Sequence, residues 1–255
     1  AAMKVEVAPR ATLLELKPQQ VDIPAGEARE VAWDVTAPAQ LAQTRAEFEA
    51  LQKGPAPAWL LGTAQVKDML QESRPGASAN EMPEAVPFLE TVPSLEIMTR
   101  AAINALSANT NGFFLMVEGG AIDKACHGNQ AGRMIEEVVE FDKAVQAVID
   151  WVDGSHAWDG TLLIVTSDHE TGMLWGPESG PGKPRPFDPV VNNGAGKLPG
   201  LRFLSITHSN ALVPLFARGP MSQRFLELAT QTDPVFGPYV DNTDVHRVMT
   251  EALMR

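Results

Sequence analysis

Three uncharged runs of strand length are the feature of the sequence that most constrains its fold. They lie at 113–117, 162–166 and 212–217. Short runs of this kind, rich in apolar residues, are typical of strands that are buried on both faces of a parallel sheet. We therefore expect strands near 112–117, 161–166 and 212–217 in one mostly parallel sheet.

A helical pattern fills the interval between the first two runs. Apolar residues recur between 130 and 152 at spacings of three and four, and Glu136, Glu140 and Lys143 are expected on the solvent side. A strand, a crossover helix and a second strand form a βαβ unit with parallel strands. The expected fold class is therefore α/β, with a mostly parallel sheet flanked by helices. Shorter helices are expected at 40–53, from Ser94 to about 106, at 222–229 and after Asp241.

The first 38 residues differ from the remainder and are expected to form a short β-rich segment. Polar and apolar residues alternate at 4–7, 20–23 and 31–35, which predicts a hairpin or a piece of a β-sandwich. A strand pair packed on the main domain is an equally good interpretation. We accordingly divide the chain into a β-rich segment at 1–38 and an α/β domain at 39–255.

Composition and charge exclude some classes of protein. The formal net charge of −12 argues against a nucleic-acid-binding protein, which needs a basic surface. It does not exclude an anionic substrate, because bound divalent cations can reverse the local field. No apolar run approaches the roughly 20 residues that a membrane span requires. The chain starts without a signal peptide, so we expect either a mature form or a missing N-terminus. The single cysteine, Cys126, cannot form an intrachain disulfide.

A histidine adjoins each of the three runs, and an aspartate accompanies it at the first two. Asp123 and His127 are four residues apart, so a helix would place both on one face. Together with His208 they supply one carboxylate and two imidazoles, a set that zinc uses when one coordination position stays open. Asp168 and His169 could hold a second ion. An isolated Asp-His pair is more often a cap beside a surface histidine, but three such placements on three strands favour a metal centre.

Glu118 ends the first run and offers only oxygen, which suits a hard ion such as Mg²⁺. Two metal ions about 4 Å apart can hold the entering and leaving oxygens of a phosphoryl transfer. The residues themselves therefore point to a metal centre, of a kind that could also serve phosphoryl transfer.

Several motifs resemble the C-terminal half of the alkaline phosphatase family, over about residues 41–255. In chain order, which is also the order of the family, they are EGGAIDKACH, TSDHETG, FDPVVNNGAGKLPG, HSNALVPLFARGP and DNTDV. The resemblance implies a first zinc ion held by Asp123, His127 and His208, and a second held in part by Asp168 and His169. It also implies Glu118 as a Mg²⁺ ligand. Lys124 matches a lysine that approaches phosphate through water in some members; a solvated lysine is the alternative.

The sequence also departs from the family pattern. It contains no Asp-Ser dipeptide, which would carry the serine nucleophile, and no Gly-Asp-Gly turn with the metal-bridging aspartate. No segment matches the family's phosphate-binding arginine. The second zinc site is therefore expected to be incomplete. Three explanations stay open: a fragment of a longer enzyme, a half that complements another chain, or a degenerate homologue that binds metal without turnover.

The resemblance implies hydrolysis of small phosphate monoesters, with inorganic phosphate as a product, in a homodimer located in the periplasm or secreted. The alternatives are a non-catalytic protein that binds metal or phosphate, and a related hydrolase of the phosphodiesterase or sulfatase type. The missing nucleophile is the main support for a non-catalytic role.

Overall fold

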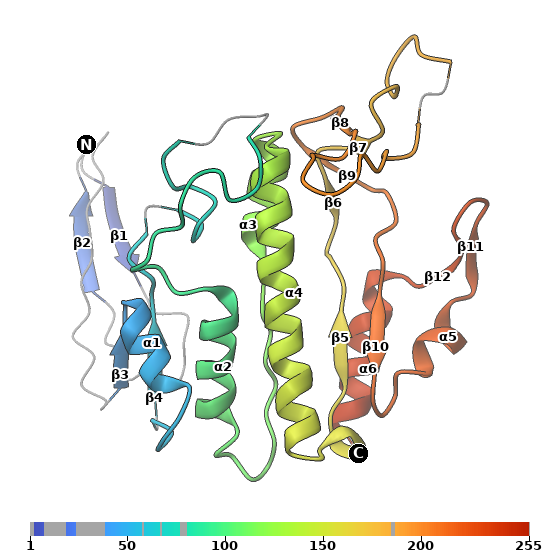
Figure 1. Ribbon diagram of the computed structural model, residues 1–255. Coiled ribbons are helices and arrows are strands. Elements are labelled where there is room, and N and C mark those ends of the chain that lie inside the picture. Colours follow the sequence, from blue (N-terminus) through green and yellow to red (C-terminus); the bar gives the residue numbers. More distant parts are fainter. Residues whose placement is uncertain are drawn as a thin grey trace.

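A long helix, α4 (Ala131–Gly154), runs through the middle of the computed structural model, with the remaining elements on either side (Figure 1). The structure describes residues 3–7, 19–23, 39–57, 59–66, 68–76, 81–184 and 187–254. Helices α2 (Leu95–Leu106) and α3 (Gly120–His127) both pack against α4. The helix expected at 130–152 is confirmed.

The second and third runs pair with each other, but in the opposite sense to the one expected. Strand β5 (Leu163–Val165) is antiparallel to β10 (Phe216–Arg218), with Ile164 opposite Ala217. The expected parallel orientation is therefore wrong for this pair. The reason is visible in the order of residues: Asp168 and His169 follow their strand, whereas His208 precedes its strand. If His169 and His208 lie at the same end of the sheet, the third strand must be antiparallel to the second.

The first run belongs to no strand pair. Residues 113–118 form an extended segment that leads from α2 to α3 (Figure 1). Among the described residues, none of its backbone groups bonds to another backbone group. The one parallel pair in the described part of the chain joins β3 (Ala39–Ala42) to β4 (Trp59–Gly62). A mostly parallel sheet that contains all three runs is therefore not observed.

The other strands of the described residues form short antiparallel pairs. They are β1 (Met3–Val7) with β2 (Gln19–Ile23), β6 (Glu170–Thr171) with β9 (His208–Ser209), β7 (Leu174–Trp175) with β8 (Arg202–Phe203), and β11 (Gln231–Asp233) with β12 (Gly237–Tyr239). Strands β1 and β2 lie where alternation predicted strands at 4–7 and 20–23. The strand expected at 31–35 lies outside the described residues.

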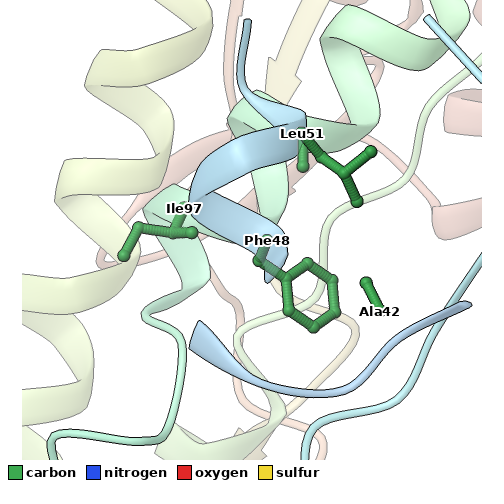
Figure 2. Packing of buried hydrophobic residues seen from close by; sticks show 5 residues of the cluster. Ala42, Phe48, Leu51 and Ile97 are labelled. Carbon is green, nitrogen blue, oxygen red and sulfur yellow. The ribbon is translucent and has the colours of Figure 1, made fainter. Parts of the chain in front are cut away.

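Helix α1 (Arg45–Leu51) is shorter than the helix expected at 40–53. Thr44 and Glu47 form a capping box that starts the helix at this point, because each side chain satisfies a free backbone N–H of the first turn. The residues before it are taken by β3. Figure 2 shows Phe48 directed toward Ala42 of β3, in a cluster completed by Leu51, Ile97 and Ala101. Burial of each large apolar side chain contributes about 1.5–3 kcal/mol.

The remaining helices follow their sequence signals. Ser94 caps α2, and Asp241 caps α6 (Asn242–Leu253). A short helix, α5 (Arg224–Leu228), precedes α6, and a 3-10 turn, η1 (Trp158–Gly160), precedes β5. On α4 the expected solvent face is wrong at Glu136, which is buried. None of the described helices has the length and apolar character needed to cross a membrane.

Candidate metal centre

Helix α3 places Asp123 and His127 side by side. It starts at Gly120, and a Cβ atom at the preceding Gly119 would lie 2.9 Å from the Phe141 ring of α4. Gly119 therefore lets the start of α3 lie close against the long helix. The i, i+4 spacing puts His127 Nε2 at 3.2 Å from Asp123 Oδ2. The helical placement expected for this pair is observed.

His208 approaches the same two side chains from a different part of the chain. The β6–β9 pair sets His208 opposite Thr171. His208 Nε2 then lies 3.3 Å from Asp123 Oδ1 and 3.0 Å from His127 Nε2. For zinc bonds of 2.0–2.1 Å, the ligand atoms of a tetrahedron are roughly 3.3 Å apart. The two Nε2 atoms are close enough to share an ion with Asp123, whose Oδ2 faces His127 and whose Oδ1 faces His208.

Hydrogen bonds from neighbouring residues orient this trio. His127 Nδ1 lies 2.6 Å from the backbone oxygen of Ile206, so a proton on Nδ1 leaves Nε2 free as a ligand atom. Thr171 Oγ1 donates a hydrogen bond to Asp123 Oδ1. Neither Ile206 nor Thr171 was singled out in the sequence, although Thr171 stands two residues after His169.

The second predicted pair adjoins the first trio. The His169 ring stacks on the His208 ring with centroids 3.6 Å apart, and ligand atoms of Asp123, His169 and His208 all lie within 4.8 Å of one another. Asp168 Oδ2 is 3.2 Å from His169 Nε2, while the Asp168 side chain is 84% exposed. A second ion could therefore meet His169 and Asp168 at the open side of the cluster.

Among the described residues, neither Glu118 nor Lys124 makes a hydrogen bond or an ion pair with the trio. Glu118 is exposed, and its Oε1 atom lies near Gly120 at the start of α3. Lys124 Nζ is 3.3 Å from Asp68 Oδ2, an exposed pair between α3 and the loop before residue 76. The structure thus brings Asp123, His127, His208 and His169 together, keeps Asp168 at their edge, and does not join Glu118 or Lys124 to them.

Cys126 lies on α3 between the two ligand candidates but does not share their role. Its side chain is buried. Burial, together with the charges of Asp123 and Glu170, raises the pKa of the Cys126 thiol to about 12. The side chain therefore packs as a protonated thiol in the helix interface.

The known proteins that match this chain are alkaline phosphatases. The family model described as alkaline phosphatase matches residues 30–195. An alkaline phosphatase from Escherichia fergusonii is 35% identical over 152 residues, which are 56% of this chain and 30% of that protein. The repressible alkaline phosphatase of Saccharomyces cerevisiae is 43% identical over 88 residues, which are 32% of this chain and 15% of that protein.

Solved structures show the same relationship at the level of fold. A cold-active alkaline phosphatase from Shewanella superposes with a TM-score of 0.56 and 21% identity, covering 84% of this chain and 59% of that one. The Thermus thermophilus alkaline phosphatase gives a TM-score of 0.55 and 23% identity, covering 85% and 56%. The chain therefore shares the α/β fold of these enzymes. It spans less than a third of the length of the two curated relatives named above.

Proposed function

The chain belongs to the alkaline phosphatase family, and on this premise we propose that its metal centre serves the hydrolysis of phosphate monoesters. The observation that carries the proposal is the convergence of Asp123, His127 and His208: the two Nε2 atoms are 3.0 Å apart, and each lies 3.2–3.3 Å from an Asp123 oxygen. A carboxylate and two neutral imidazoles at these separations suit zinc with one open position. Small phosphate monoesters are the proposed substrates and inorganic phosphate the proposed product.

We further propose specific metal ions for the two other positions. Asp168 and His169 would hold part of a second zinc site, and Glu118 would bind Mg²⁺ through oxygen. A solved TAB5 alkaline phosphatase mutant contains bound Mg²⁺, which supports a role for this ion in the family. Divalent cations, when bound, supply positive charge for a phosphate group. This chain contributes oriented ligands, with Thr171 fixing Asp123 and the Ile206 carbonyl fixing His127.

The same premise limits what this chain does by itself. No Asp-Ser dipeptide occurs in the 255 residues, so the serine that would attack phosphorus must come from outside them. We propose that the purified chain turns over nitrophenyl phosphate negligibly. This absence also favours the second candidate function, a non-catalytic protein that binds metal or phosphate. Strong turnover by the purified chain would exclude that candidate and refute our account of the missing nucleophile.

Metal analysis tests the central part of the proposal. We expect His208→Ala to lose one of three ligands and to retain little zinc after dialysis, whereas the parent chain keeps it. His246→Ala is the matched control, because His246 is exposed on α6. Zinc content is measured by mass spectrometry, and circular dichroism checks that each variant is folded. Equal zinc content in the parent chain and His208→Ala would show that His208 is not a ligand.

Location and assembly are proposals drawn from the family, and the domain division is a proposal drawn from the sequence pattern. We propose a periplasmic or secreted location, which fractionation of the source cells would test. We propose a homodimer, which sedimentation would refute by showing only monomer. We also propose that residues 1–38 are a separate β-rich segment. Removal of these residues should then leave zinc binding unchanged.

A further inference from the structure

Asn129 lies two residues after His127, directly beyond the end of α3. Its backbone φ is +52°, a left-handed conformation that asparagine tolerates better than most residues. Two backbone hydrogen bonds close the helix, from Asn129 N–H to the oxygen of Cys126 and from Gln130 N–H to the oxygen of Ala125. This is the Schellman motif, which favours glycine or asparagine at the left-handed position. The backbone explains why asparagine is suitable here, but it leaves the side chain without a role.

The side chain of Asn129 reaches beyond its own helix. Its amide nitrogen lies 3.0 Å from the backbone oxygen of Cys126 and 2.9 Å from the backbone oxygen of Ser205. Both neighbours are carbonyl oxygens that can only accept, and the NH2 group has one hydrogen for each of them. Asn129 therefore links the end of α3 to a segment far along the chain.

The contacted segment, residues 205–208, contains a ligand of the metal centre. Its first carbonyl accepts from Asn129, and the next carbonyl, that of Ile206, lies 2.6 Å from His127 Nδ1. The end of α3 thus contacts two consecutive carbonyl groups of the segment. His208 follows two residues after Ile206, with its Nε2 atom 3.0 Å from His127 Nε2. The distance between the two histidines therefore depends on how segment 205–208 is attached to α3.

Apolar packing contributes little to fixing segment 205–208. Ile206 is 64% exposed, and the β6–β9 pair that the segment enters is two residues long on each strand. Backbone hydrogen bonds at Ser205 and Thr207 attach the segment to Gly172, on the side of β6. Its attachment to α3 therefore depends on polar side chains at the end of that helix.

We propose that Asn129 is a positioning residue of the metal centre, which attaches segment 205–208 to α3 and so keeps His208 within ligand distance of Asp123. An amide neither ionises at ordinary pH nor competes with the imidazoles for zinc, so this attachment is present whether or not an ion is bound. A segment that is already ordered loses less conformational entropy when its histidine becomes a ligand, which raises the affinity for the ion. The consequence for zinc rests on the metal centre proposed above.

Asn129→Gly tests this role without disturbing the end of the helix. Glycine adopts positive φ freely and is the usual residue at this position of the motif, so the variant keeps the backbone turn and loses the amide. Asn104→Ala is the matched control. The Asn104 amide also donates to a backbone carbonyl, that of Leu51 at 3.0 Å, but it joins α2 to α1. Circular dichroism checks that both variants are folded.

Hydrogen–deuterium exchange with chelator present tests the attachment in the metal-free chain. We expect the amides at 203–209 to exchange about 2–10-fold faster in Asn129→Gly than in the parent chain, the change expected for one lost hydrogen bond. Asn104→Ala should leave their exchange unchanged. Faster exchange confined to 123–130 would show that Asn129 only caps the helix, and unchanged exchange in both regions would show that its side chain fixes nothing. Either result overturns the proposal.

A double-mutant cycle tests the consequence at the metal centre. In competition titrations with Zn²⁺, Asn129→Gly should bind about 10–100-fold more weakly than the parent chain, as expected for loss of a group that orients a ligand. Because Asn129 acts through His208, most of this loss should disappear when both chains also carry His208→Ala. An equal loss in the two backgrounds would indicate a general structural effect, and the proposal would fail.

Failure of the metal centre itself gives a different result. If the parent chain binds no Zn²⁺, the proposed function is wrong. The exchange rates at 203–209 are measured without metal, so they still decide whether Asn129 fixes the segment that carries His208.

Discussion

Glu137 on α4 gives the sharpest prediction about stability, because it is a buried acid without a full set of partners. Its residue is 6% exposed, and its Oε1 atom has no hydrogen-bond partner. The neighbouring Glu136 carboxylate is paired with Arg74 at 2.8 Å. Burial raises the pKa of Glu137 to about 7, and the charges of Glu136, Glu140 and Glu72 add to this rise while Arg74 opposes it.

The sign of the effect follows from the proton balance. Below the usual carboxyl pKa of 4.5, the folded and unfolded chains both hold this proton. Between that value and about 7, only the unfolded chain releases it, so the free energy of unfolding falls across this window. Each pKa unit corresponds to about 1.4 kcal/mol, which gives a loss on the order of 3 kcal/mol by pH 8.

Glu137→Gln should remove most of this pH-dependent loss, because glutamine has a similar shape and no charge in either state. We expect the variant to unfold near the parent's free energy at pH 4.5 and to be more stable than the parent by roughly 3 kcal/mol at pH 8. Urea unfolding at pH 4.5, 6, 7 and 8, with chelator present throughout, measures the difference. Asp142→Asn, at an exposed position of the same helix, is the control. A constant difference between Glu137→Gln and the parent across this range would refute the reasoning.

Three further substitutions test individual contacts. Thr171→Val removes the hydrogen bond to Asp123 and should weaken zinc affinity by about 10–100-fold, while the free energy of unfolding stays the same. A competition titration measures the affinity, and the same affinity in the variant and the parent chain would contradict a positioning role for Thr171. Arg74→Ala removes the nearest cation from the buried Glu136 carboxylate, which keeps the Glu84 N–H at 2.6 Å and Arg133 at 3.7 Å. It should lower the free energy of unfolding by about 1.5–3 kcal/mol, the range for a hydrogen bond between charged groups; no measurable loss in urea unfolding would show that the pair is effectively solvated. Gly132→Ala places a Cβ atom 2.1 Å from a backbone oxygen of the 81–84 loop and should destabilise by about 1–3 kcal/mol. Gly154→Ala meets no atom within 4 Å and serves as its control; equal thermal unfolding of the two would contradict the close packing.

Local signals in the sequence located most helices and several strands. Ser94 and Asp241 begin their helices because a short polar side chain can accept a hydrogen bond from a free N–H of the first turn. The spacing of three and four located α4. The same local rules failed at 40–44: residues 39–42 became β3 through pairing with β4, a contact that nearby residues do not specify. The capping pattern of Thr44 and Glu47 was present and would have moved the helix start to its observed place.

Residue type and spacing also suggested which side chains to examine at the site. Asp123 and His127 share a helix face by spacing alone, and the structure places His208 beside them. The sequence did not supply the antiparallel sense of β10, although the position of His208 before its strand contained that information. The sequence also did not single out Thr171. Its hydroxyl can orient Asp123 only because the fold brings the Asp123 carboxylate within hydrogen-bonding distance.

Burial was decided by tertiary structure alone. Glu136 lies at a position of α4 that periodicity assigns to solvent, but the loop that carries Arg74 covers this face and buries the pair. Conversely, the apolar segment at 113–117 was expected inside a sheet, yet Phe114 and Met116 are exposed because no strand of the described residues covers them. The sequence by itself determined which residues can be helical, extended or metal-binding, since these properties depend on side-chain chemistry and near neighbours. The structure decided which of them meet, because that depends on contacts between residues far apart in the chain.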